Sequence, residues 1–244
     1  MEDSQKSMQY IDFIENETDL AFVELNNNSK NLIVSFASNR HTGFERKTSL
    51  LSLHSEYTDL DYMFLRNQNG WYLGKLVGIG ESVLDTIEFF RNKFKNYHKV
   101  IMIGNSAGAF ASLLYGSLLN VHGALAGMAQ TNLEHTKNHL PKGHPGGESL
   151  KHFAERNPEI FDKYSNVANH LIESVNYYVW YRGNQFYIDD LGLDMNNYQH
   201  SNSIILHGDH NYDNIKNTSS VNFVGRTPSE VQNGLPTILN LLNH

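Results

Sequence analysis

The sequence predicts an α/β fold, in which a largely parallel β-sheet is covered by helices. Short apolar runs alternate along the chain with longer amphipathic stretches, which is the pattern of strands joined by crossover helices. Three apolar runs, at residues 31–37, 61–65 and 99–104, are largely continuous rather than alternating. Continuous runs are typical of strands that are buried on both faces of a sheet.

The first residues predict an antiparallel hairpin. Strands near residues 10–14 and 20–25 flank the polar turn Glu15-Asn16-Glu17, so that the hairpin spans residues 8–26. We therefore expect an N-terminal antiparallel hairpin on an otherwise mostly parallel sheet.

The amphipathic stretches predict the helices. Residues 81–94 carry apolar side chains at helical spacing, with acids and bases on the other side. The apolar positions are Val83, Ile87, Phe90 and Phe94. A second helix is expected at residues 109–119, directly after the strand at 99–104. The capping box Thr227-Pro228-Ser229-Glu230, with proline at the first helical position, predicts a terminal helix through about Leu242.

Three further strands are expected at residues 123–128, 176–181 and 203–207. Between them the regular pattern breaks down, and the run from Leu140 to Gly147, rich in proline and glycine, is expected to be irregular. Long irregular insertions in compact domains are usually functional or mobile. We expect a small irregular cap over the active site at about residues 131–165, the alternative being a surface loop without a role.

The bulk properties limit the possible functions. The chain of 244 residues shows no internal repeat or linker, so a single domain over residues 1–244 is expected. Its net charge of −7 gives no reason to bind nucleic acid or an anionic membrane. No apolar run is long enough to span a membrane, and the first residues do not resemble a signal peptide, so we expect a cytoplasmic protein. The absence of cysteine excludes disulfides, zinc–thiolate sites and a cysteine nucleophile. The oligomeric state is left open.

One motif indicates a specific chemistry. Gly104-Asn105-Ser106-Ala107-Gly108 matches G-x-S-x-G and lies between a predicted strand and a predicted helix. In a nucleophile elbow the serine adopts a strained backbone at a sharp turn, and the flanking glycines let strand and helix approach. Ser106 would then lie at the amino end of a helix, with the N–H of Ala107 as an oxyanion donor. The alternative is a glycine-rich turn with an inert serine.

From about Asn31 onward, the order of elements around this elbow resembles the α/β-hydrolase fold, a three-layer sandwich. The segments WYLGKLVGIGES, GNSAGAFASL and HGDHNYDNI are also similar to hydrolase-like proteins linked to bacterial polysaccharide and glycoprotein modification. The resemblance implies the chain order nucleophile, acid, histidine.

This order suggests the other members of a catalytic triad. The histidine is expected after the last strand, which we assign to residues 203–207. His210 follows that strand and a glycine, and His207 at the strand end is the alternative. The acid should follow the strand at 176–181. Asp189 is favoured there, Asp190 is nearly equivalent, and Asp194 would serve if the loop were longer.

The resemblance also places the second oxyanion donor in the loop after residues 31–36, where the N–H of Ala37 or Ser38 is the candidate. The loop reads Phe36-Ala37-Ser38-Asn39-Arg40 and lacks the HGGG form of many lipases and esterases. Asn39 and Trp71 are the candidates for substrate binding, although ordinary packing explains Trp71 equally well. Arg182 is more simply a surface residue than a substrate ligand.

A metal site is not expected. His207-Gly208-Asp209-His210 contains two histidines and a carboxylate, but no second cluster completes a ligand set. The expected reaction is therefore cofactor-free ester hydrolysis through an acyl-enzyme on Ser106, acting on a small-molecule or glycan ester. An acyltransferase that uses a sugar hydroxyl, and a hydrolase-like protein that only binds or scaffolds, remain as alternatives.

Overall fold

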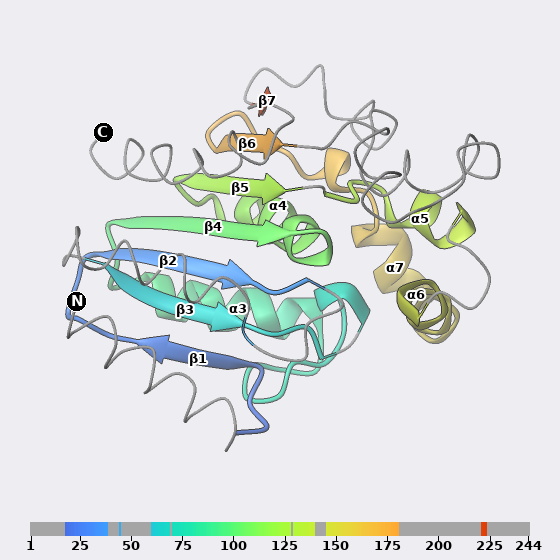
Figure 1. Ribbon diagram of the computed structural model, residues 1–244, viewed down its shortest axis with the longest axis horizontal. Helices are drawn as coiled ribbons and strands as arrows, with labels where there is room; N and C mark the ends of the chain where they lie inside the picture. Colours follow the sequence, from blue (N-terminus) through green and yellow to red (C-terminus); the bar gives the residue numbers. More distant parts are fainter. Residues whose placement is uncertain are drawn as a thin grey trace, which may run out of the picture.

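The computed structural model describes residues 18–38, 44, 60–68, 70–127, 129–139, 145–180 and 221–223. Within them the chain forms a seven-stranded mixed sheet with the strand order β1-β3-β2-β4-β5-β6-β7 (Figure 1). The strands are β1 (Phe22–Leu25), β2 (Asn31–Phe36), β3 (Asp61–Leu65), β4 (Lys99–Asn105), β5 (Gly123–Gly127), β6 (Asn176–Trp180) and β7 (Val221–Phe223). The predicted α/β class is confirmed.

Only the first described strand, β1, is antiparallel to its neighbour, whereas β3, β2, β4, β5, β6 and β7 run parallel. Because these strands are parallel, their carboxyl ends meet at one edge of the sheet. The register brings Asn105 of β4 beside Gly127 of β5, and Gly127 beside Trp180 of β6. Residues that follow these three strands therefore start from one row along the carboxyl edge.

Two helices pack on the same face of the sheet (Figure 1). The first, α3 (Val83–Phe94), begins where the Ser82 hydroxyl accepts a hydrogen bond from the Asp85 N–H at 3.3 Å. This is the N-cap interaction that satisfies a free donor at a helix start. The second, α4 (Ala107–Leu119), follows β4 directly and is almost wholly buried. A helix that is apolar on all sides is expected only inside a core.

Both faces of the sheet are buried at its central strands. On the face that contacts α3 and α4, Leu32, Val34 and Phe36 of β2 join the main core. Their neighbour Ile33 points to the other face and is equally inaccessible, as are Phe64 of β3 and Ile101 of β4. Burial on both faces explains why these strands are continuously apolar, and it agrees with the expected three-layer arrangement.

The cap at about residues 131–165 was expected to be irregular, and this expectation is wrong for most of its residues. The described residues form α5 (Leu133–His139), α6 (Pro145–Arg156) and α7 (Pro158–Tyr164), followed by the short 3-10 helix η2 (Val167–Asn169). Figure 1 shows α5, α6 and α7 beyond the carboxyl ends of β4 and β5. Proline can occupy the first turn of a helix because its missing N–H has no partner there. Pro145 and Pro158 therefore mark helix starts rather than breaks.

The strand beside β6 also differs from the expectation. Val221–Phe223 occupies this place, with Tyr177 paired to Val221, so the assignment of residues 203–207 as the last strand is wrong. His210 consequently precedes the last described strand instead of following it. The predicted strand at 10–14, residues 203–207 themselves and the predicted terminal helix lie outside the described residues. In the part of the chain that the structure describes, no helix is long and apolar enough to cross a membrane.

Candidate active site

The turn between β4 and α4 holds Ser106 in a strained conformation. Its φ of 53° and ψ of −118° lie outside the regions that a non-glycine residue ordinarily adopts. Such a conformation costs on the order of 1–3 kcal/mol and persists only where the surroundings enforce it. Here the Ser106 N–H donates to the Gly127 carbonyl of the neighbouring strand at 2.8 Å. The elbow is therefore fixed by the sheet itself.

The two glycines of the motif are required by close backbone approach. A Cβ atom on Gly104 would overlap the carbonyl group of Gly108, the second residue of α4. A Cβ atom on Gly108 would overlap the Phe36 carbonyl at the end of β2. The obstacles are backbone atoms rather than flexible side chains, so only glycine fits either position. The start of α4 therefore lies in close backbone contact with the carboxyl edge of the sheet.

The Ser106 hydroxyl is not used for capping. Serine before a helix usually accepts a hydrogen bond from an N–H of the first turn, but Ser106 makes no side-chain cap interaction with α4. Its hydroxyl is partly exposed and lies 3.4 Å from the carboxamide oxygen Oε1 of Gln130. The hydroxyl is thus presented at the carboxyl edge instead of being occupied by its own helix.

Gln130 is a neighbour of Ser106 that the sequence analysis missed. It lies just after β5, the neighbour of the nucleophile strand, and is completely buried. The signal was present in the sequence, because a polar residue directly after a buried strand next to the elbow must lie at the same sheet edge.

The candidate oxyanion donors can be compared directly. The N–H of Ala107 is the first of α4, and no partner for it is found within the described residues. The N–H of Ala37, in contrast, donates to the Leu65 carbonyl at 2.9 Å. Ala37 is therefore committed to the sheet, and its assignment as an oxyanion donor is wrong. The other candidate in this loop, Ser38, stays a prediction.

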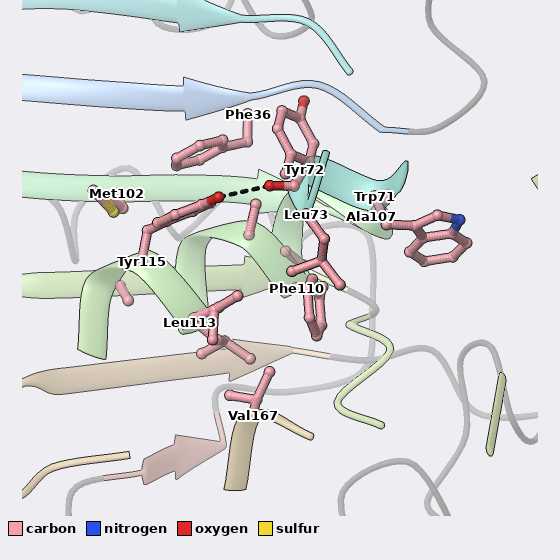
Figure 2. Packing of buried hydrophobic residues seen from close by; sticks show 14 of the residues in the cluster. Phe36, Trp71, Tyr72, Leu73, Met102, Ala107, Phe110, Leu113, Tyr115 and Val167 are labelled. Carbon is pink, nitrogen blue, oxygen red and sulfur yellow. Dashed lines mark hydrogen bonds between the residues drawn. The ribbon is translucent and has the colours of Figure 1, made fainter. Parts of the chain in front are cut away.

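Trp71 lies in the 3-10 turn η1 (Gly70–Tyr72) with its side chain only 2% exposed. Its indole Nε1 donates to the carbonyl of Gly146 in α6 at 3.2 Å. Figure 2 shows the indole ring directed away from Tyr72 and Leu73. Trp71 thus connects the core to the cap helices. Asn39, the other substrate-binding candidate, lies outside the described residues.

The other proposed triad members lie in a segment for which the structure gives no description. These are His210, His207, Asp189 and Asp190, and Asp194 and Arg182 share the same segment. The structure does fix where this segment begins. Trp180 ends β6 two strands away from Asn105, which is about 10 Å at the usual strand spacing. The residues that follow Trp180 therefore start at the edge where Ser106 lies.

Within the described ranges, no group of three or more histidine, aspartate and glutamate side chains is placed to hold a metal ion. The histidine-containing sequence at residues 207–210 is outside those ranges.

The strand order, the parallel direction of six strands and the strained serine between β4 and α4 together define the α/β-hydrolase fold. No protein-family model and no curated protein matches the sequence. Solved structures do match, and esterases are among them.

Two of these matches extend over nearly the whole chain. The capsule O-acetyltransferase of Neisseria meningitidis serogroup A superimposes with a TM-score of 0.55 at 11% identity, over 91% of this chain and 90% of that chain. Esterase B from Lactobacillus rhamnosis superimposes with a TM-score of 0.52 at 8% identity, over 98% of this chain and 94% of that chain.

A third match is to a longer chain, from the Glycosylation Associate Protein (Gap123) complex of Streptococcus agalactiae. The TM-score is 0.54 at 14% identity, and the match covers 90% of this chain but 44% of that chain. The present chain therefore spans less than half the length of that relative. At these identities the likeness establishes the fold.

Proposed function

We propose that the protein is a serine hydrolase that cleaves carboxylic esters through an acyl-enzyme on Ser106. The observation that carries this proposal is the backbone of Ser106, which is strained at φ 53° and held by the sheet while its hydroxyl is left uncapped. A fold gains nothing from such a conformation at a serine unless the side chain has to be presented, and strain of this kind clusters at functional sites.

The proposed base is His210, with His207 as the alternative. In this mechanism Ser106 Oγ attacks the ester carbonyl carbon while the histidine accepts the hydroxyl proton. The tetrahedral intermediate collapses, the ester C–O bond breaks, and the histidine returns the proton to the departing alcohol. A water molecule, deprotonated by the same histidine, then attacks the acyl-enzyme and releases the carboxylic acid and free Ser106.

The proposed acid is Asp189, with Asp190 as the alternative. It would orient the imidazole and stabilise the imidazolium. Both residues follow β6 within ten positions of Trp180. Support comes from the register, which starts this segment at the edge that holds Ser106.

The developing oxyanion would be stabilised by two backbone donors, the N–H groups of Ala107 and Ser38. Ala107 begins α4, so its N–H also carries the positive end of the helix dipole. Ser38 follows β2, the strand next to β4 in the sheet. The two donors would approach the substrate carbonyl from neighbouring strands, which is the arrangement that acyl-transfer sites need.

We propose a short or glycan-borne acyl group as the substrate. The fold neighbours include an esterase, a capsule O-acetyltransferase and a protein of a glycosylation-associated complex. Trp71 and Asn39 are proposed to line the substrate pocket below the cap. Transfer to a sugar hydroxyl is the second candidate, suggested by the O-acetyltransferase.

The test is steady-state hydrolysis of p-nitrophenyl acetate by the wild type and by Ser106→Ala. We expect the substitution to reduce kcat by at least about 10⁴-fold while circular dichroism and the unfolding midpoint stay unchanged. A sugar acceptor in the same assay separates the candidates, because an acyl-sugar product identifies a transferase. Equal turnover by wild type and Ser106→Ala would refute the serine mechanism. If neither protein turns over the ester and neither is labelled by a fluorophosphonate, a binding or scaffold role is the remaining candidate.

A further inference from the structure

A groove of about 670 Å³ lies beside α3, away from the candidate active site. It is lined by α3 on one side and by Lys163, Tyr164 and His170 on the other, and we call it the α3 groove. Leu118 of α4 also lines it. Residue 118 follows Ala107 by eleven positions along this helix, which corresponds to about 16 Å. The α3 groove is therefore a separate feature from the elbow.

The α3 side of the groove is a continuous stripe of exposed side chains. The residues of this stripe are Leu84, Glu88, Arg91 and Lys95. Their spacing of three and four residues places them on one face of the helix. From residue 84 to residue 95 the stripe measures about 16 Å, or about three helical turns. This shape fits an elongated partner that lies along α3.

The inner surface of the α3 groove is apolar. Ile87 and Tyr164 line it and are 6% and 5% exposed. At one end Leu84 is 63% exposed, the largest fraction among the large hydrophobic residues in the described ranges. Apolar side chains rimmed by polar residues are typical of a surface that binds another molecule. The groove thus offers apolar contact over part of its length.

The rim of the α3 groove is positively charged. Arg91, Lys95 and Lys163 line it, and Glu88 is the single acid among the described lining residues. In the described part of the chain, none of the three cations forms an ion pair. The Lys95 ammonium donates to a neutral carboxamide at 2.7 Å, and the Lys163 ammonium lies over the Tyr164 ring. This local charge is opposite in sign to the net charge of −7, so it is complementary to an acidic partner.

The aromatic ring in the groove is already covered. The His170 ring stacks on Tyr164 with a centroid distance of 5.5 Å, and the Lys163 ammonium lies 5.1 Å from the centroid of the same ring. A nucleotide would use an open aromatic face for stacking, which this nearly buried ring does not offer. Aliphatic side chains need only an apolar surface. The groove is thus better suited to a peptide than to a stacked ring.

A two-fold dimer through the α3 groove is also disfavoured. Such an interface brings a surface patch against the same patch of the second copy. The cations of one copy would then face the cations of the other, and like charges across an interface repel. The groove is therefore better matched to a different protein.

We propose that the α3 groove docks an acidic amphipathic helix of a partner protein. The apolar face of that helix would lie on Ile87 and Leu84, and its carboxylates would pair with the cations of the rim. Helices that bind in grooves present apolar anchors every three to four residues, the same spacing as the stripe on α3. The proposal is independent of the serine mechanism, because the groove and the elbow are separate.

The probe is a fluorescein-labelled peptide of about 14 residues, long enough to span the stripe. It carries leucine at helical spacing, glutamate on both sides of the leucines and alanine elsewhere. Fluorescence anisotropy with the full chain should show saturable binding with a Kd below about 100 μM. The affinity should fall as NaCl is added, because salt screens exposed charges. A scrambled peptide and a peptide with lysine in place of glutamate should bind at least about tenfold more weakly.

Arg91→Glu tests the rim, and Arg156→Glu is the matched control. Both arginines are exposed and lie in the last turn of a helix, α3 or α6. Only Arg91 is among the described residues that line the groove. We expect Arg91→Glu to weaken binding of the glutamate peptide at least about tenfold and Arg156→Glu less than about twofold. Equal weakening by the two variants would overturn the proposal.

Two further variants test the apolar contact and the sign of the charge. Leu84→Gln should weaken binding of the glutamate peptide at least about threefold, with an unchanged unfolding midpoint because the side chain is exposed. The double variant Arg91→Glu with Lys163→Glu should bind the lysine peptide at least about tenfold more tightly than the wild type does. An unchanged affinity in either comparison would overturn the proposal.

The same measurements identify other occupants. A folded wild type that does not bind the glutamate peptide would overturn the proposal, and binding of a hyaluronan tetrasaccharide in its place would indicate an acidic glycan. A dimer in sedimentation equilibrium that is lost in Arg91→Glu would indicate a second copy and would also overturn it. Ser106→Ala should bind the peptide like the wild type, so a failure of the serine mechanism leaves this result unaffected.

Discussion

The hydroxyl oxygen of Ser106 lies 3.4 Å from the carboxamide oxygen of Gln130. Gln130 is held on a well-anchored connection between β5 and the cap. The carbonyl of Thr131 accepts a hydrogen bond from the Val167 N–H at 2.9 Å, and the Leu133 N–H donates to the Ser165 carbonyl at 2.8 Å. A neutral, buried group is therefore fixed beside the proposed nucleophile.

Gln130→Glu should replace this neutral group by a carboxylate of the same shape. Negative charge develops next to it in the transition state, and two like charges 4 Å apart repel by about 4 kcal/mol at an effective dielectric constant of 20. We expect kcat for p-nitrophenyl acetate to fall at least about 100-fold. The uncharged Gln130→Met should lose less. Equal rates for Gln130→Glu and the wild type would contradict this placement of Gln130.

Gly108→Ala should disrupt the elbow, because the new Cβ atom would overlap the Phe36 carbonyl. We expect a loss in unfolding free energy of about 3 kcal/mol or more, or an insoluble protein. Gly116→Ala is the control in the same helix. There the new Cβ would meet the Ala124 side chain at 3.0 Å, and helix propensity favours alanine by about 1 kcal/mol. Urea denaturation that shows equal losses for the two variants would refute the steric argument.

Substitutions after β6 should identify the base and the acid. His210→Ala should reduce kcat nearly as much as Ser106→Ala, because members of a triad act as a unit. Of Asp189→Asn and Asp190→Asn, we expect only Asp189→Asn to cause a large loss, up to about 10⁴-fold. The wild-type rate should rise with pH, with an apparent pKa of about 6–7. Full activity of His210→Ala together with an inactive His207→Ala would reassign the base.

His122 should make stability depend on pH. Partial burial, and then the nearby Lys99 ammonium, lower the pKa of His122 below its ordinary value, and its Nδ1 accepts the Val100 N–H at 3.3 Å. The folded protein therefore favours the neutral ring. As pH falls through about 6.5, the unfolded chain takes up a proton first, so stability is lost.

The measurement is the melting temperature at pH 7.5 and at pH 5.5. Because His122 is largely exposed, its contribution should be small, and His122→Gln should show a slightly smaller decrease between the two conditions. If the melting temperature of His122→Gln fell more between the two conditions than that of the wild type, the pKa of His122 would be raised in the folded protein, and the assignment of a lowered pKa would be refuted.

The sheet and the elbow were predictable because their signals are local. The predicted strand at residues 31–37 is observed as Asn31–Phe36, and the predicted strand at 99–104 as Lys99–Asn105. A strand buried on both faces is apolar at every position, and the elbow requires glycines at fixed spacing. Neither depends on which strand becomes its neighbour.

The cap helices were missed although the sequence carries their pattern. Leu150, Phe153 and Ala154 in α6 have helical spacing and are buried, while Pro145 stands at the first position of the helix. The glycines at 146 and 147 suggested a loop, because glycine disfavours helices. Their place in α6 depends on tertiary contact, since the Gly146 carbonyl accepts the Trp71 indole N–H.

The error at Ala37 has a different origin. Its N–H is used by Leu65 of β3, and this contact exists only because β3 lies beside β2 in the sheet. The sequence does not contain the strand order, so the loss of this donor could not be foreseen. The strand β7 was missed because the three residues Val221–Phe223 are too short to show a period.

The most direct test of the proposed function is covalent labelling of the folded wild type with a fluorophosphonate, followed by mass spectrometry of the intact protein and its peptides. The reagent requires an activated serine and no knowledge of the substrate. We predict a single adduct on Ser106, absent from the heat-unfolded protein and from folded Ser106→Ala. A folded wild type that remains unlabelled, or an adduct that persists in Ser106→Ala, would contradict the assignment of Ser106 as the nucleophile.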